Sequence, residues 1–165
     1  MLAAGLDTGV VVDRMRARRL GRELRRRRAL RSALAALRHS DHTAETLGRR
    51  LTTRGVAPVE RDAVVETMTR AGLLDDARFA QGRATALAAR GAGDGLIRDD
   101  LERRGVAVDV IADALARLEP ETERVRGVVA ADGLSARTLR RLAAKGFSPD
   151  VLEELVADGV DAELR

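Results

Sequence analysis

Two histidines and two acidic pairs are the residues whose types could support catalysis. His39 and His42 lie three positions apart and could share a metal ion on one face of a helix or turn. No third ligand is indicated near them, so we interpret them as solvated side chains. The aspartate pairs at 75–76 and 99–100 could hold the metal of a nuclease. Each pair lies at or near the expected start of a helix, where capping of backbone N–H groups explains it without a metal.

A glycine-rich stretch, Gly91-Ala-Gly-Asp-Gly95, is the one segment whose composition suggests a phosphate-binding loop. It lacks the spacing of such a loop and the Lys-Ser/Thr pair that follows it, so we interpret it as a flexible linker. The chain contains no cysteine, which excludes thiolate ligands and cysteine nucleophiles. The sequence therefore predicts a protein that is not an enzyme, with no catalytic residue, no metal site and no cofactor.

Positive charge is concentrated at the start of the chain. Residues 1–38 contain 11 arginines and three acidic residues, a net charge of +8, whereas the rest of the chain has a net charge of −4. Range 14–38 is predicted to be a helix, and its leucines fall on one stripe: Leu20, Leu24, Leu30, Leu34 and Leu37. The run Arg25 to Arg28 is either a solvated helix face or a contact for a polyanion such as nucleic acid.

The elements that must carry these side chains are predicted to be helices. Of 165 residues, 45% are hydrophobic but only 1% are aromatic, and the helix formers Ala, Leu, Arg and Glu dominate around only three prolines. No sustained alternation of apolar and polar residues predicts a sheet. No apolar run approaches the roughly 20 residues that span a bilayer. We therefore expect an all-α cytoplasmic protein that does not enter the membrane.

A six-residue phrase, Leu-x-x-(Arg/Lys)-Gly-apolar, occurs three times, at 51–56, 101–106 and 142–147. The glycine is expected to end a helix in the left-handed conformation that other residues reach only at a steric cost. Prolines 58 and 149 suit the first turn of the next helix. Positions six and ten residues after each glycine share one helix face, although Arg61 interrupts its apolar pattern: 61 and 65, 111 and 115, 152 and 156.

These spacings indicate helical repeat units that are stabilised by their neighbours. Between the first two copies, Asp75 is placed to cap a helix, and the two aromatics, Phe79 and Phe147, are interpreted as core residues. We divide the chain as follows: 1–13, a poorly ordered N-terminus; 14–38, a basic N-terminal helix; 39–80, the first repeat; 81–120, the second; 121–165, the third.

This order of motifs resembles the RecX family. The motifs that carry the likeness span residues 29–158: Leu51-Thr-Thr-Arg-Gly-Val56, Gly72-Leu-Leu-Asp-Asp-Ala-Arg-Phe-Ala80, Ile97-Arg-Asp-Asp-Leu-Glu-Arg-Arg-Gly-Val106 and Leu142-Ala-Ala-Lys-Gly-Phe147. The resemblance implies tandem three-helix repeats that form an elongated, curved helical array, here preceded by a basic N-terminal helix. The chain departs from the family in the glycine-rich segment before the second repeat, where a basic, often aromatic stretch is usual.

The resemblance also implies a function. It predicts a monomer that binds the RecA recombinase filament and modulates, chiefly by inhibition, its ATPase, strand-exchange and co-protease activities in DNA repair and the DNA-damage response. Cations near the repeat phrases, with the arginine run of the N-terminal helix, are the predicted contacts: Arg25, Arg26, Arg27, Arg28, Arg49, Arg50, Arg54, Arg78, Arg83, Arg98, Arg103, Arg104, Arg140, Arg141 and Lys145.

An alternative stays open for a chain of short helices with exposed arginines. It could be a helical DNA-binding protein, a transcription or nucleoid factor, that holds single- or double-stranded DNA through the basic helix 14–38. The scarcity of aromatic side chains argues against single-strand binding by stacking. The net negative charge after residue 38 argues against simple duplex binding and fits a protein surface better.

Overall fold

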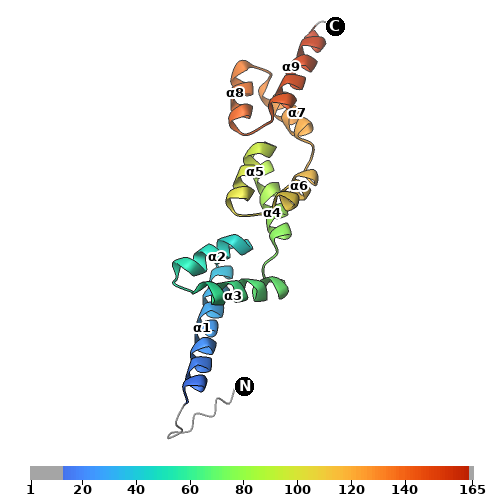
Figure 1. Cartoon of the computed structure of the whole chain (residues 1–165). Coiled ribbons are helices and arrows are strands. Elements are labelled where there is room, and N and C mark those ends of the chain that lie inside the picture. The colour runs from blue at the N-terminus through green and yellow to red at the C-terminus, as the bar shows by residue number, and fades with distance from the viewer. Residues whose placement is uncertain (1–12, 164–165) are drawn as a thin grey trace.

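The chain folds into three helical units in a row. The computed structural model describes the backbone of residues 13–163 and the side chains of residues 13–158. Over that range all regular structure is α-helical, and Figure 1 shows an elongated molecule. The helices are α1 (Arg14–Leu37), α2 (Ala44–Thr53), α3 (Pro58–Arg70), α4 (Asp76–Ala88), α5 (Asp94–Arg103), α6 (Val108–Ala116), α7 (Glu121–Asp132), α8 (Ala136–Ala144) and α9 (Pro149–Glu163). The predicted all-α class and the three-helix repeats are confirmed.

Each unit has a small core of its own. Three separate apolar clusters lie within α1–α3, α4–α6 and α7–α9. The boundaries expected from the sequence divide these units differently. Range 14–38 was expected to stand apart, but its second half supplies a helix of the first unit, and range 39–80 takes in the start of α4, which packs in the second. The prediction for residues 1–13 falls, apart from Asp13, outside the described residues.

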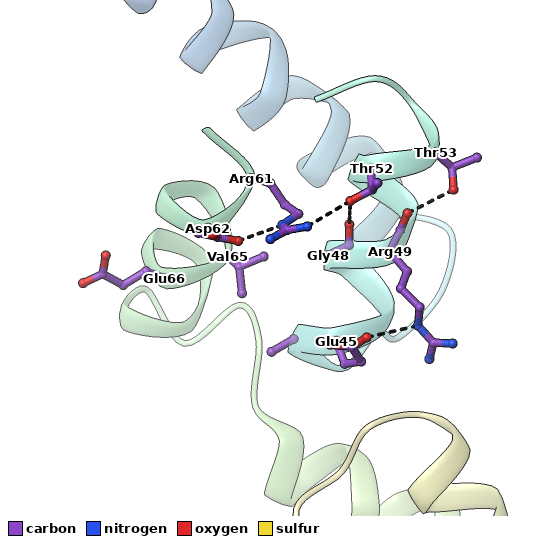
Figure 2. A pocket seen from close by; sticks show the side chains of 10 residues that line it. Glu45, Gly48, Arg49, Thr52, Thr53, Arg61, Asp62, Val65 and Glu66 are labelled. Atoms are coloured by element: carbon purple, nitrogen blue, oxygen red, sulfur yellow. Dashed lines mark hydrogen bonds and ion pairs between the residues drawn. The ribbon is translucent and has the colours of Figure 1, made fainter. Parts of the chain in front are cut away.

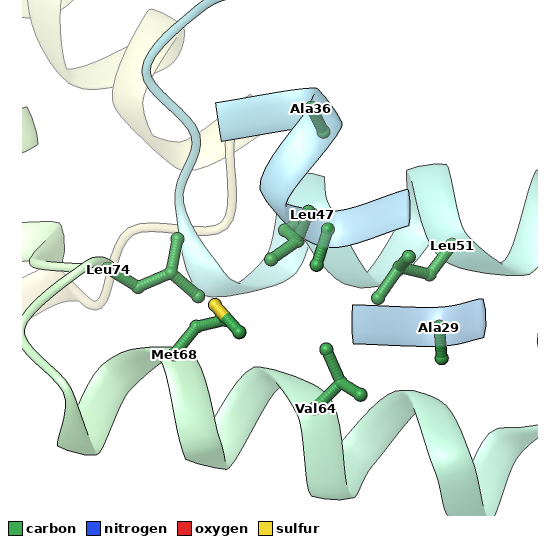
Figure 3. Packing of buried hydrophobic residues seen from close by; sticks show 8 residues of the cluster. Ala29, Ala36, Leu47, Leu51, Val64, Met68 and Leu74 are labelled. Carbon is green, nitrogen blue, oxygen red and sulfur yellow. The ribbon is translucent and has the colours of Figure 1, made fainter. Parts of the chain in front are cut away.

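The buried face of α1 is made of alanines rather than leucines. Ala29, Ala33 and Ala36 are at most 1% exposed and face the core of the first unit, as Figure 3 shows for the two that it labels. Leu30 and Leu37 of the expected stripe pack against this core, whereas Leu24 and Leu34 are 50% and 43% exposed, so only part of the stripe is buried. Small side chains on α1 let the backbones of α2 and α3 approach it closely. The spacing of apolar residues in the sequence does not by itself indicate such close packing.

The repeated six-residue phrase forms the C-terminal end of a helix, and the hydrogen bonds there explain why it contains a glycine. In the first unit the Val56 N–H donates to Leu51 O at 3.1 Å and the Gly55 N–H to Thr52 O at 2.9 Å, with Gly55 at φ +74°. This is the Schellman pattern, which needs a residue with positive φ. The same outer bond joins Val106 to Leu101 at 3.1 Å and Phe147 to Leu142 at 3.2 Å. The predicted left-handed glycines are confirmed at all three sites.

The units meet end to end through their middle helices, α2, α5 and α8 (Figure 1). At the first joint the last turn of α5 reaches the N-terminus of α2. The Thr43 hydroxyl, fully buried, donates to Arg104 O at 2.6 Å, and Arg49 Nη2 donates to Arg103 O at 2.9 Å. The Ala44 N–H donates to the Asp76 carboxylate at 2.9 Å. Carbonyls at one helix end thus meet donors at the start of another, which also aligns their dipoles.

The second joint repeats this arrangement at the glycine-rich segment. The N–H groups of Gly93 and Gly95 each donate at 2.9 Å, to Lys145 O and Gly146 O at the end of α8. A Cβ on Gly93 would overlap the backbone of Gly146 and Phe147. The interpretation of residues 91–95 as a flexible linker is therefore wrong. Because Gly93 and Gly95 have no Cβ, the backbone here can contact the backbone at the end of α8 directly.

Candidate partner-binding surface

Five of the predicted contact residues come together around the first joint. Arg49 comes from α2, Arg78 and Arg83 from α4, and Arg103 and Arg104 from the end of α5; we call these five residues the joint cluster. Arg78, Arg83 and Arg104 line a groove of about 690 Å³ between the first two units. An adjoining hollow is lined by Arg49, Arg103 and Arg104. Residues spread over 56 positions of the chain thus form one basic surface.

Asp100 holds two members of the joint cluster in place. Arg83 binds its carboxylate in a bidentate manner at 2.8 and 3.0 Å, and Arg104 Nε donates to the same group at 2.9 Å. The hydrogen bond from Arg83, with that from Arg104, lowers the pKa of Asp100 from 3.8 to about 2 despite partial burial. The Arg104 guanidinium also lies over the Phe79 ring, 5.9 Å from its centroid. Arg83 and Arg104 are therefore structural residues as much as contacts.

Sequence reasoning missed Asp100, which we placed with Asp99 at a helix start. It lies in the second half of α5, four residues before Arg104. Residues four positions apart are neighbours on a helix, so this spacing indicates an ion pair between Asp100 and Arg104. Nothing in the sequence indicates the pair with Arg83, which is 17 positions away. Asp75, by contrast, caps α4 as expected, since its carboxylate accepts the Arg78 N–H at 2.9 Å.

Arg78 and Arg103 are the free members of the joint cluster. Both side chains are exposed, and neither makes an ion pair within residues 13–158. Arg49 is partly engaged, since its Nε lies 3.5 Å from the Glu45 carboxylate. Free guanidinium groups beside fixed ones leave unoccupied donors that carboxylates or phosphates can bind.

The predicted contacts near the second joint are more dispersed. Lys145 Nζ donates to Arg90 O at 3.0 Å, and Arg141 pairs with Asp132. Arg140 on α8 and Arg98 on α5 are exposed and belong to no ion pair of the described part of the chain. The structure does not gather these residues into one surface.

Two residues that hold the second joint were not foreseen. Arg124, 9% exposed in its side chain, donates to Ala92 O at 2.7 Å and pairs with Asp94. The Glu121 carboxylate accepts the Asp94 N–H at 2.6 Å and the Ser148 N–H at 3.2 Å, so that it bridges two helix starts. These partners lie 27 to 32 positions away, and no local spacing signals them.

The arginine run of α1 lies at the middle of that helix, where Arg25 contacts α3, and none of its residues lines the hollows of the joint cluster. Arg25 Nε donates to Glu60 at 2.8 Å, which lowers the pKa of that carboxyl, and Arg27 lies 3.6 Å from Glu23. Arg26 and Arg28 are exposed, with no ion pair inside the described range. The two predicted contacts left to place lie at the end of α2: Arg50, which is exposed, and Arg54, whose Nη1 donates to Ser32 O at 3.4 Å.

A further hollow, of about 760 Å³, lies between α2 and α3 and is lined by charged side chains. Figure 2 shows its lining as a set of paired charges: Arg61 donates to Thr52 Oγ1 at 3.2 Å and to Asp62 at 2.7 Å, and Arg49 pairs with Glu45. A groove whose cations and carboxylates satisfy one another offers no nucleophile and no open metal position.

The two histidines and the acidic pairs do not come together as a metal site in the described part of the chain. Residues 13–158 hold no group of three His, Cys, Asp or Glu side chains arranged to bind a metal ion. His39 Nδ1 lies 2.7 Å from Ala35 O and His42 Nε2 lies 3.1 Å from Ser40 Oγ, so the two histidines have separate partners. Among the described helices none has the length and apolar character that would let it cross a bilayer.

Comparison with known proteins gives a consistent result. A family model described as "RecX, second three-helix domain" matches residues 75–115, which correspond to α4–α6. The chain is 33% identical over 110 residues to the regulatory protein RecX of Xanthomonas axonopodis pv. citri, covering 66% of this chain and 68% of that one. It is 34% identical over 136 residues to the regulatory protein RecX of Halorhodospira halophila, covering 76% and 84% of the two chains.

Two crystal structures share the fold. RecX from Lactobacillus salivarius aligns with a TM-score of 0.68 at 18% identity, over 81% of this chain and 96% of that chain. A second structure, titled regulatory protein RecX, aligns with a TM-score of 0.73 at 21% identity, over 90% and 80%. At these identities the likeness establishes the architecture, and the sequence relatives, which are named regulatory proteins, carry the family assignment.

Proposed function

This chain belongs to the RecX family, as its motifs predict, and we propose that it is a regulator without enzymatic activity that binds the RecA recombinase filament. Its effect is inhibition of the filament's ATPase, strand-exchange and co-protease activities in DNA repair and the DNA-damage response, in the cytoplasm. The chain is a row of small units, and a filament presents the same surface at regular intervals. An elongated molecule can therefore contact several protomers at once, which raises avidity without any single strong contact.

The joint cluster is the observation that supports this proposal most directly. Arg78 and Arg103 are exposed and free of ion pairs among the described residues, while Arg83 and Arg104 beside them are fixed by Asp100. The fixed guanidinium groups of Arg83 and Arg104 lose little conformational freedom on binding, and the free ones of Arg78 and Arg103 have donors that no residue of 13–158 occupies. We propose that Arg78 and Arg103 bind carboxylates or phosphates of the filament, with Arg49, Arg83 and Arg104 completing the surface. The remaining candidates, Arg50, Arg54, Arg98, Arg140, Arg141 and Lys145, are secondary contacts.

The test is the single-strand-DNA-dependent ATPase rate of the cognate RecA, with and without this protein. Inhibition at substoichiometric ratios is expected. The double variant R78E/R103E should need about thirtyfold to about nine-hundredfold more protein for half inhibition, because each of the two lost charged contacts costs about 1–2 kcal/mol. We leave Arg104 unchanged because reversing its charge would also break its pair with Asp100.

A matched control separates the surface from net charge. The variant R117E/R137E changes the same charge at two exposed arginines, after α6 and on α8, that have no ion pair within residues 13–158, and it should inhibit like the unmodified protein. Equal potency of the two double variants would remove the joint cluster from the interface. Helix content measured by circular dichroism should be the same in all three proteins.

A second candidate function rests on α1. Its arginines from Arg14 to Arg28 are exposed on a helix that extends away from the first unit, a geometry suited to phosphate contacts with DNA. A DNA-binding protein should bind DNA in the absence of RecA, with affinity that falls steeply as salt rises. If the ATPase rate is unaffected and α1 binds DNA directly, the family fold stands and this second function replaces the first.

A further inference from the structure

Helix α1 carries exposed leucines, interspersed with arginines, that no element of residues 13–158 covers. Leu24 and Leu34 are 50% and 43% exposed, and Leu20 on the same side is partly exposed; these three residues are the leucine face of α1. Leu30, by contrast, packs against the core of the first unit. The core of the first unit uses the alanine face instead. Scattered exposed leucines are ordinary, but several on one face of one helix mark a surface that another element can cover.

An apolar groove lies at the other end of the molecule, between α8 and α9. It has a volume of about 440 Å³ and is lined by Leu139, Leu152, Glu153, Val156 and Ala157. The equivalent groove of the first unit, between α2 and α3 (Figure 2), has Arg61, Asp62, Val65 and Glu66 at the positions of the four α9 residues. In the first unit this groove is occupied by paired charges, whereas in the third unit it is open and apolar. The difference comes from the side chains, since both units share the fold.

The charges beside the two surfaces are complementary. Range 14–38 contains 11 arginines and one glutamate, a net charge of +10, and Arg27, Arg28 and Arg31 are exposed beside its leucines. Range 149–158 contains four acidic residues and no basic one, and Glu153 is exposed at the groove without an ion pair inside residues 13–158. Glu154 and Asp158 are exposed beside it and share Arg126 of α7 as their ion-pair partner. The two surfaces lie at opposite ends of the elongated molecule (Figure 1). Each can therefore meet its counterpart only on another molecule.

We propose that the leucine face of α1 of one copy binds in the α8–α9 groove of a second copy, so that the chains associate head to tail. An amphipathic helix in an apolar groove buries its leucines, and the flanking arginines and carboxylates fix its position. Because the contact joins two different surfaces, it does not close on itself, and further copies can add at each end. The proposal differs from the monomer expected from the sequence and does not depend on binding to RecA.

The test is sedimentation velocity of the full chain, free of nucleic acid, from about 1 to about 200 μM, where small charged interfaces associate. The average mass should rise with concentration above the 17.8 kDa of one chain and fall back as salt increases. A head variant, L24E/L34E, and a tail variant, E153R/V156R, should each associate at least tenfold more weakly. Mixed together they should form 1:1 dimers and nothing larger, because each supplies the surface that the other lacks.

A matched control carries the same two apolar-to-acid changes elsewhere. Val59 and Val108 are 80% and 74% exposed on α3 and α6, and V59E/V108E should associate like the unmodified chain. Circular dichroism checks that helix content is unchanged, and L24E alone replaces the head variant if it is not. A protein that sediments as one chain throughout would overturn the proposal, as would a tail variant that still dimerises alone. Association only after DNA is added would assign the α1 face to a polyanion instead.

Discussion

At the scale of single residues, Asp100 explains most about how the joint cluster is built. One carboxylate binds two guanidinium groups from two helices, and it lies 15% exposed in its side chain. Without it, Arg83 and Arg104 would repel each other in a half-buried groove. Asp100 thus converts a group of like charges into a fixed surface, which sequence reasoning had described only as a set of free arginines.

The pKa of Asp100 predicts how stability depends on pH. Because its folded pKa of about 2 lies below the ordinary 3.8, the carboxylate stabilises the fold by about 2 kcal/mol at neutral pH. That stabilisation should be lost as pH falls from about 4 to about 2. D100N should therefore unfold more easily in urea at pH 7 by about 2 kcal/mol, and the difference should shrink towards zero near pH 2.

A matched variant is available one residue away. Asp99 is exposed and makes no ion pair within the described part of the chain, so D99N should change stability by less than about 0.5 kcal/mol at pH 7. Equal losses for D99N and D100N would show that Asp100 does not hold the joint cluster together.

At the scale of elements, helix α1 shows that a stripe of leucines need not be the buried face. The first unit closes around Ala29, Ala33 and Ala36, against which Leu47, Leu51 and Val64 pack (Figure 3). The larger partners come from α2 and α3, so small residues on α1 complete the packing at normal density. Leu30 and Leu37 pack at the edge of this core, whereas Leu24 and Leu34 remain exposed and available to another molecule.

Two neighbouring substitutions on α1 test this register. A33L places a larger side chain at a position that is 0% exposed and should destabilise the protein by about 1–3 kcal/mol through overpacking. L34A removes a half-exposed side chain and should change stability by less than about 0.5 kcal/mol. Both are measured by urea unfolding monitored by circular dichroism. If the leucine stripe were the core face, L34A would instead cost about 2–5 kcal/mol.

At the scale of the whole molecule, the two end-to-end joints determine how the units are arranged. Each unit has its own apolar cluster, and contact between units is made by backbone groups, caps and a few charged side chains. Such contacts are directional but bury little apolar surface. The array therefore depends on close backbone approach at Gly93 and Gly95 and on the buried Thr43 hydroxyl.

Substitution of one glycine should separate the third unit from the second. In G93A the added Cβ would overlap the backbone of Gly146 and Phe147, so the joint must open, at a cost of about 1–3 kcal/mol. Amide hydrogen exchange should accelerate in residues 121–158 and stay unchanged in residues 44–70. G82A is the control: Gly82 lies inside α4 with no atom within 4 Å of an added Cβ, and alanine there should stabilise the helix by about 0.5–1 kcal/mol. Unchanged exchange in G93A would show that the third unit does not depend on this joint.

The sequence determined what depends on short-range backbone chemistry. The helical class, the three left-handed glycines, the proline at the first turn of α3 and the Asp75 cap all follow from residues within about six positions of one another. Steric limits on φ and unsatisfied N–H and C=O groups at helix ends act over that range, so they leave a readable spacing. The motifs were specific enough to indicate the family as well.

Tertiary structure alone decided which arginines are fixed and which are free, which face of α1 is buried, and why residues 91–95 are rich in glycine. Arg83 meets Asp100 across 17 positions, and Gly93 meets Lys145 across 52. Such pairs depend on how whole helices pack, and the energy of that packing comes from burial and close fit rather than from local spacing. The same physical reason left the leucines of α1 and the α8–α9 groove unrecognised as complementary surfaces until both were seen in three dimensions.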